Sequence, residues 1–131
     1  MIQITRTKDS RGLPQYELAP DTPTNRAILD AMRSWSRAAD LSGFAAARHG
    51  YGNSDGGFGV TYPSDMDADE LEASGLEDGM VMVYAFFGPP DGSELAVPES
   101  EYLDCLAAFL DAHALAADAA RVRALRAGDT G

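Results

Sequence analysis

The chain has 131 residues, of which 45% are hydrophobic, a composition typical of one globular domain with its own core rather than of a disordered chain. Its formal charge of −11 argues against nucleic acid or an anionic membrane surface as the main partner. The single cysteine excludes an internal disulfide, and the longest apolar run, residues 80–87, is far shorter than the roughly 20 residues of a membrane helix; we therefore expect a soluble, cytoplasmic protein.

Alternating residues near the start of the chain predict a β-hairpin. Ile2 and Ile4 alternate with polar residues, as do Tyr16 and Leu18, which places each pair on one face of a strand. Residues 9–12, Asp-Ser-Arg-Gly, supply turn chemistry between them. We expect an antiparallel hairpin with one buried face.

A helix is predicted from Thr22 to about Asp40. Thr22 is a suitable N-cap, and proline is tolerated in the first turn that follows it. One apolar stripe at helical spacing runs along this segment, through Ile28, Met32, Trp35 and Ala39. We interpret the tryptophan on this stripe as a core residue rather than as a platform on which a ligand stacks.

The middle of the chain carries mixed signals. Residues 44–48 fit either a strand or a last helical turn, and the glycine-rich residues 50–57 predict a turn. Residues 58–62 alternate as a strand does. Residues 67–74 predict a short helix, because Gly75 stands where a left-handed residue is favoured after a helix.

Two strands and two helices are predicted in the last part of the chain. Residues 80–87 are apolar at every position, as in an interior strand covered on both faces, and residues 94–97 supply its partner across a Gly-Pro-Pro-Asp-Gly turn. A helix begins near Pro98 with acids in its first turn, and residues 114–126 continue helically. The inward side of the first of these helices comprises Tyr102, Leu106, Phe109 and His113.

Short connections between these elements favour antiparallel neighbours. We therefore expect an α+β fold with one mostly antiparallel sheet and helices packed on one face of it. Residues 1–127 should form a single domain, and residues 128–131 a frayed C-terminal tail.

Acidic and basic residues are segregated along the chain. Residues 1–50 carry seven Lys or Arg, residues 51–120 carry fifteen Asp or Glu and no Lys or Arg, and the last eleven residues carry three arginines. Either the terminal arginines fold back against the acidic section, or a negative surface faces the solvent. Such a surface can serve solubility alone or attract a basic partner.

The cysteine and the two histidines do not form a catalytic pattern. Cys105 and His113 are eight residues apart on one predicted helix, about 12 Å along its axis, so they cannot bond to each other there. We interpret Cys105 as a buried thiol and His113 as a core or helix-end histidine. A pairing of Cys105 with His49 is geometrically open, but nothing in the sequence supports it.

Metal and nucleotide sites are not indicated either. The alternating acids of residues 65–69 are similar to the start of a calcium loop, but Glu70 and Leu76 stand where that loop requires Gly and Glu. The glycine-rich residues 50–59 lack the lysine and the following helix of a phosphate-binding loop. We expect no cofactor, no metal and no enzymatic activity.

One segment resembles a known group of proteins. A strand at residues 81–87, a turn, a strand at residues 94–97 and the pattern acid-x-acid-aromatic-Leu-x-x-Leu at residues 99–106 resemble the C-terminal half of small bacterial immunity proteins from toxin–immunity systems, which include polymorphic-toxin and contact-dependent inhibition systems. The resemblance implies a non-enzymatic inhibitor that covers the phosphate-binding site of a basic nuclease toxin with carboxylates. It assigns no functional residue.

Five carboxylates within eight residues are the best-placed partner-binding residues, because no base lies near them in the sequence: Asp65, Asp67, Asp69, Glu70 and Glu72. The alternative interpretation is that Ser64 or Asp65 caps a short helix and that the other acids favour its N-terminus. If this segment does not bind, the next acids to consider are Glu77, Asp78, Glu99 and Glu101.

Apolar anchors would also be needed for affinity, and three aromatic residues flank the acidic segment: Tyr51, Phe58 and Tyr62. The sequence thus predicts an inhibitor of a basic toxin. An accessory or regulatory interaction domain, homodimeric through an apolar strand or helix surface, is the alternative.

Overall fold

The computed structural model of the chain describes residues 2–33, 35, 37–53, 58–85 and 93–129. Within these ranges the protein has the α+β fold predicted from the sequence. The strands are β1 (Gln3–Lys8), β2 (Pro14–Ala19), β3 (Tyr51–Asn53), β4 (Phe58–Thr61), β5 (Met80–Ala85) and β6 (Ser93–Pro98). The helices are α1 (Pro23–Arg33), α2 (Asp40–Ala47), α3 (Ala68–Ser74), α4 (Glu99–Ala112) and α5 (Ala116–Asp129), with a 3₁₀-helix, η1 (Pro63–Asp65).

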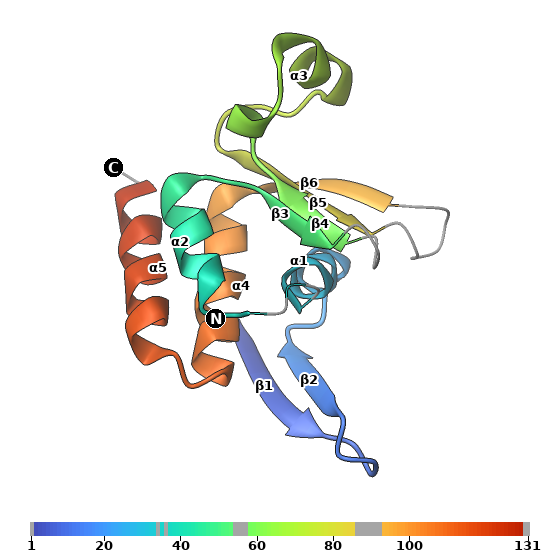
Figure 1. Cartoon of the computed structure of the whole chain (residues 1–131), viewed down its shortest axis with the longest axis vertical. Coiled ribbons are helices and arrows are strands. Elements are labelled where there is room, and N and C mark those ends of the chain that lie inside the picture. Colours follow the sequence, from blue (N-terminus) through green and yellow to red (C-terminus); the bar gives the residue numbers. More distant parts are fainter. Residues whose placement is uncertain (1, 34, 36, 54–57, 86–92, 130–131) are drawn as a thin grey trace.

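The strands form two antiparallel sheets rather than the single sheet that we expected. β1 and β2 pair only with each other, and the second sheet has the order β3-β4-β5-β6. The predicted hairpin is confirmed, and its buried pair, Ile4 opposite Leu18, lies in the core. The two sheets are separate because β1 packs on α4 and the chain enters α1 directly after β2 (Figure 1).

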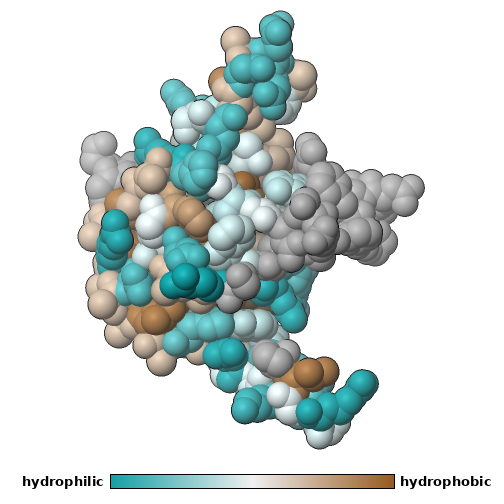
Figure 2. All heavy atoms as spheres, viewed as in Figure 1, coloured by the Kyte–Doolittle hydropathy of each residue, from teal (hydrophilic) through white to brown (hydrophobic). Residues whose placement is uncertain are grey.

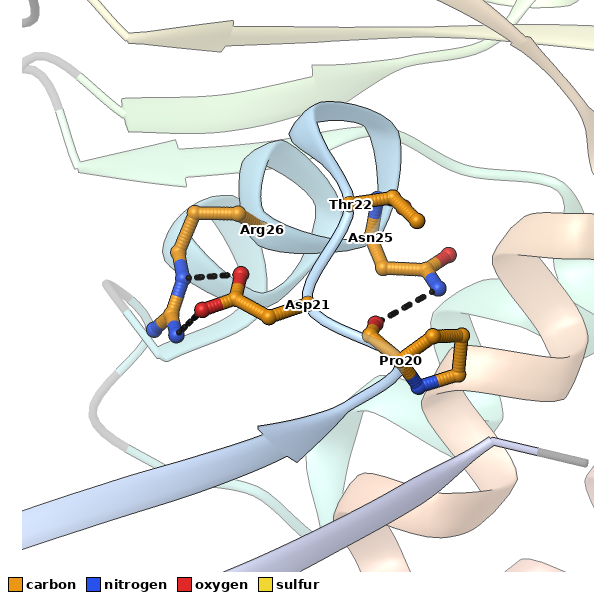
Figure 3. A network of polar contacts seen from close by, with 5 residues as sticks. All are labelled: Pro20, Asp21, Thr22, Asn25 and Arg26. Atoms are coloured by element: carbon orange, nitrogen blue, oxygen red, sulfur yellow. Dashed lines mark hydrogen bonds and ion pairs between the residues drawn. The ribbon is translucent and has the colours of Figure 1, made fainter.

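The predicted start of the first helix is confirmed in detail (Figure 3). Thr22 Oγ1 accepts a hydrogen bond from the backbone N–H of Asn25 at 3.1 Å, which satisfies one of the free donors at the start of α1. The Asn25 side chain donates to the carbonyl of Pro20 at 3.1 Å, and the Arg26 guanidinium bonds the carboxylate of Asp21. The chain is thereby fixed on both sides of the helix start.

The predicted extension of this helix to Asp40 was wrong. α1 ends at Arg33, and a second helix, α2, starts at Asp40. Trp35 lies between the two helices, half-buried, with its ring edge-on to Phe44 and Tyr51 at centroid distances of 5.3 and 5.8 Å. It is therefore a packing residue, as predicted, but it reaches the core from a connection and not from a helical stripe.

Residues 44–48, which the sequence left open between strand and helix, end α2. The turn predicted over residues 50–57 was wrong at its start, since residues 51–53 form β3. A close contact explains the glycine in the strand that follows this segment. A Cβ on Gly59 of β4 would lie 2.6 Å from the carbonyl oxygen of Tyr51, so only glycine fits this position of the sheet.

The interior position of β5 is confirmed, because it pairs with β4 on one side and with β6 on the other. Its residues Val81 and Val83 are buried on the face that α1 and α4 cover. On the opposite face Met82 is buried, whereas Met80 and Tyr84 are half-buried. Residues 86 and 87 of the predicted strand lie outside the described residues.

The two C-terminal helices pack against each other, and α4 fills the centre of the molecule. Ala119 and Val122 of α5 are fully buried, and the helical conformation predicted for residues 114–126 is confirmed from Ala116 onward. α5 extends to Asp129, so it includes two residues of the expected frayed tail; residues 130 and 131 lie outside the described residues. No helix in the described part of the chain combines the length and the apolar character needed to cross a membrane.

Candidate functional site: an acidic arm and the pocket at its root

Residues 63–79 form a projection, here called the acidic arm, that leaves the sheet at the end of β4 and returns at the start of β5. It contains η1 and α3, and it stands at the end of the molecule opposite the β1–β2 hairpin (Figure 1). No residue of α3 is buried. The arm has seven Asp or Glu and no Lys or Arg, and Figure 2 shows it as predominantly hydrophilic.

Asp65, the first of the five predicted partner-binding acids, has a structural role at the base of the arm. Its Oδ2 accepts hydrogen bonds from the backbone N–H groups of Gly50 and Tyr62, each at 2.8 Å, and its Oδ1 lies 3.5 Å from Nδ1 of His49. A Cβ on Gly50 would lie 2.6 Å from the same carboxylate oxygen, so this contact also requires glycine. Asp65 therefore ties the arm to the start of β3.

The other four predicted acids lie on or beside α3. Asp67 is the N-cap of this helix and accepts a hydrogen bond from the backbone N–H of Glu70 at 2.8 Å. Asp69, Glu70 and Glu72 are exposed, and none of the ion pairs in the described part of the chain involves them. Capping therefore accounts for Asp67, whereas it leaves these three carboxylates in solvent.

The C-terminal arginines do not reach the arm. Arg123 pairs with Asp111, and Arg126 lies 3.3 Å from Asp104, so both neutralise acids of α4. The two arrangements that the charge segregation left open thus occur together: part of the acidic section is paired with returning arginines, and the arm presents its charge to solvent.

Another ion pair joins Arg48, directly after α2, to Glu99, the first residue of α4. Arg48 directs Nε and Nη2 to the two carboxylate oxygens of Glu99, at 3.1 and 2.9 Å. Only 6% of the Glu99 side chain is exposed, whereas 61% of the Arg48 side chain is. Arg48 has φ 51° and ψ 47°, a left-handed conformation that is unfavourable for a residue with a Cβ, and Ser64 donates to its carbonyl oxygen at 3.1 Å.

Two pockets open on either side of this ion pair. The larger, of about 460 Å³, lies between α2, α4 and α5 and has apolar walls that include Ala45, Leu103 and Leu125. The smaller, of about 90 Å³, lies where the two ends of the arm meet the body of the molecule. Arg48 and Glu99 line both pockets. Of the acids that we named as second choices, Glu99 is thus buried and paired.

The aromatic residues predicted as apolar anchors are core residues instead. Tyr51 and Tyr62 are buried, and the Tyr51 hydroxyl lies 2.5 Å from that of Tyr102 on α4. The side chain of Phe58 lies outside the described residues. Burial raises the pKa of both Tyr51 and Tyr102 well above the usual range, so this pair is neutral.

Tyr62 differs from its two neighbours, because its buried hydroxyl has no hydrogen-bond partner in the described part of the chain. Its ring meets that of Tyr102 edge-on at 6.3 Å. The sequence named Tyr62 as an anchor and Glu99 as a second-choice acid, but it did not bring them together with Arg48, since the three residues are far apart in the chain.

The cysteine and the histidine on α4 have the structural environments that we expected. Cys105 is fully buried, its thiol lies 3.5 Å from Oδ1 of Asn25, and burial raises its pKa to about 12. His113 Nε2 lies 2.9 Å from the hydroxyl of Tyr16, and burial lowers its pKa. Among the described residues, no three His, Cys, Asp or Glu side chains are grouped as metal ligands would be.

Comparison of the chain with protein-family models, with curated proteins and with solved structures finds no match.

Proposed function

We propose that the chain is a non-enzymatic binding protein that engages a basic protein through the acidic arm. The observation that carries this proposal is the exposed set Asp69, Glu70 and Glu72 on a projecting helix with no buried residue. A helix that buries nothing contributes little to the core, so its place at the tip of a projection has no evident structural purpose.

The physical consequence is a local negative potential that reaches beyond the rest of the molecule. Complementary charge accelerates encounter with a cationic partner, to about 10⁸–10⁹ M⁻¹s⁻¹ at low salt. Because the charges sit on a projection, a partner can meet them without approaching the basic residues of the β1–β2 hairpin, at the opposite end of the molecule (Figure 1). This arrangement suits a protein that must capture its target quickly.

The resemblance to immunity proteins supplies the class of partner. A toxin that cleaves nucleic acid binds phosphates with Lys and Arg, and carboxylates on a projecting helix can occupy such a site in place of phosphate. We therefore propose a cognate basic toxin, in particular a nuclease, as the partner. Neutralisation would follow from covering the toxin's site and would need no catalysis by this chain.

The test uses the protein encoded next to this chain in its genome as the candidate toxin. The association rate is measured for the native chain and for Glu72→Lys, at about 10 mM salt, where the Debye length is about 30 Å, and at about 1 M, where it is about 3 Å. We expect Glu72→Lys to slow association about threefold to tenfold at low salt and to leave it nearly unchanged at high salt.

Glu17→Lys is the matched control, because it makes the same change of charge at an exposed position of β2, at the opposite end of the molecule. Equal slowing by both substitutions would show a response to net charge alone and would remove the arm from the interface. A chain that binds no basic neighbour and instead self-associates would favour the homodimeric interaction domain.

A further inference from the structure

The pocket at the root of the acidic arm is built from both ends of that arm. Tyr62, Pro63 and Ser64 line it where the arm begins, and Asp78, Gly79 and Met80 line it where the arm returns. Arg48 and Glu99 close it from the body of the molecule. Its volume of about 90 Å³ is room for about three water molecules or for one side-chain head group.

The charges around the pocket favour a cation. The guanidinium of Arg48 is offset by the two oxygens of Glu99 that it bonds, and Asp78 adds a further carboxylate. The arm above contributes six more acids and no base. An anion would therefore meet a repulsive field, whereas a cation with several N–H donors would meet oxygen acceptors.

The hydroxyl of Tyr62 is the second and independent observation. Tyr62 is 2% exposed, it lines the pocket, and its Oη is buried without a hydrogen-bond partner in the described residues. A buried hydroxyl in that state costs free energy, and buried polar groups of folded proteins are nearly always bonded. A donor placed in the pocket would give this oxygen the bond that the chain itself does not supply.

We propose that this pocket binds one cationic side chain, arginine or lysine, whose N–H groups donate to Tyr62 Oη, Asp78 and Glu99. The inference rests on the proposed function for the source of that side chain, the basic partner. The arm then attracts the partner at long range, and the pocket fixes it by one buried contact beside the arm. Such a contact near the centre of an interface is where binding energy concentrates.

The experiment uses small cations in place of the partner. Methylguanidinium and methylammonium chloride are titrated into the labelled native chain at constant ionic strength, and the backbone amide shifts of Ser64 and Gly79 are followed. We expect saturable shifts at these two amides, and the tighter of the two cations identifies the favoured side chain. Sodium acetate, the anionic control, should give no saturable shift.

Three variants make the result specific. Tyr62→Phe should weaken binding at least about tenfold, as expected for the loss of one buried hydrogen bond to a charged group. Asp78→Asn, at an exposed position, should weaken it about threefold. Glu17→Gln removes a carboxylate from an exposed position of β2, at the opposite end of the molecule, and should leave the affinity unchanged.

Shifts that rise without saturation, that are equal in all four proteins, or that saturate with acetate instead would overturn the inference. Its failure is separable from that of the proposed function. Saturable cation binding in a chain that binds no basic protein would keep the pocket and reject the arm as a docking site. Protein binding that depends on the arm, in a chain without a saturable cation site, would keep the arm as a docking site and reject the pocket.

Discussion

Replacing Tyr62 with phenylalanine should make the protein more stable, which is unusual for a fully buried position. The substitution removes an oxygen that has no hydrogen-bond partner in the described structure and keeps the ring that packs edge-on against Tyr102 at 6.3 Å. A buried polar group left without a bond costs about 1–3 kcal/mol, and replacing it with an apolar group of the same shape recovers that cost.

We expect the free energy of unfolding to rise by about 1 kcal/mol, the lower end of that range. For a chain of this length that corresponds to a melting temperature higher by about 3–5 °C. Urea denaturation measures the change directly, and an unchanged m-value would show that the unfolded state is not responsible.

Tyr102→Phe is the control, because it removes a hydroxyl that is bonded. It leaves the buried Tyr51 hydroxyl without the partner now 2.5 Å away, so the protein should lose about 1–3 kcal/mol. The double variant Tyr51→Phe/Tyr102→Phe should recover most of that loss, since both unpaired groups are then gone. If Tyr62→Phe destabilised the protein as much as Tyr102→Phe, the Tyr62 hydroxyl would be bonded in solution and the reasoning would fail.

Three further predictions follow from the same contacts. Asp65→Ala should lower the free energy of unfolding by about 1–3 kcal/mol, because two backbone N–H groups lose a charged acceptor. Glu72→Ala should change it by no more than about 0.5 kcal/mol, and the denaturant midpoints of the two variants would show the difference. Ala114→Gly should raise the free energy of unfolding by as much as about 1 kcal/mol, because Ala114 has φ 59°, a conformation that glycine adopts without strain. Ala117→Gly, at an exposed position in the first turn of α5, should lower it by about the same amount. Equal losses of stability in thermal melts of the two variants would contradict the argument. Burial lowers the pKa of His113 below the ordinary value of 6.5, so the unfolded state binds more protons between those two pH values. Its contribution to stability should be complete above about pH 6.5 and should decline as the pH falls through the folded pKa; unfolding measured across that range should show a shallower decline in His113→Gln.

The elements that the sequence predicts well are those with a local signal. The hairpin follows from period-two alternation on both sides of a turn, and the end of α3 from Gly75, which has φ 70°; the N-cap is Asp67 rather than Ser64 or Asp65. β5 follows from a run of apolar residues too long to lie at an exposed edge. In each case the information lies within about ten residues, which is the range that periodicity and capping can reach.

The errors occurred where tertiary contacts overrode such signals. The apolar stripe continues through Trp35 although α1 ends at Arg33, because the indole packs on α2 and β3 from outside the helix. Glycines in residues 50–57 indicated a turn, but Gly50 is glycine because the carboxylate of Asp65 approaches its backbone. A glycine selected by a contact fifteen residues away has the same appearance in the sequence as one selected by a turn.

The candidate site was predictable in its charge and not in its geometry. The absence of bases from residues 51–120 identified the acidic segment, and all five named acids are at exposed positions there, although Asp65 and Asp67 accept backbone hydrogen bonds. That segment could not reveal that Asp65 would hold the base of the arm, since its bonding partners, Gly50 and Tyr62, are assembled only by the pairing of β3 with β4.

Tyr62→Phe, at the root of the arm, should raise the free energy of unfolding and weaken cation binding. The Tyr62 hydroxyl costs the free chain about 1 kcal/mol, and a bond to a partner's side chain is what would repay that cost. The left-handed backbone of Arg48, in the same pocket, is a second local cost at that place. Tyr62→Phe separates the alternatives in one protein: higher stability with weaker cation binding supports a functional hydroxyl, whereas higher stability with unchanged binding leaves a local packing defect. The two measurements use the same purified variant, and their joint outcome decides whether the strained root of the arm is part of the binding surface or only its support.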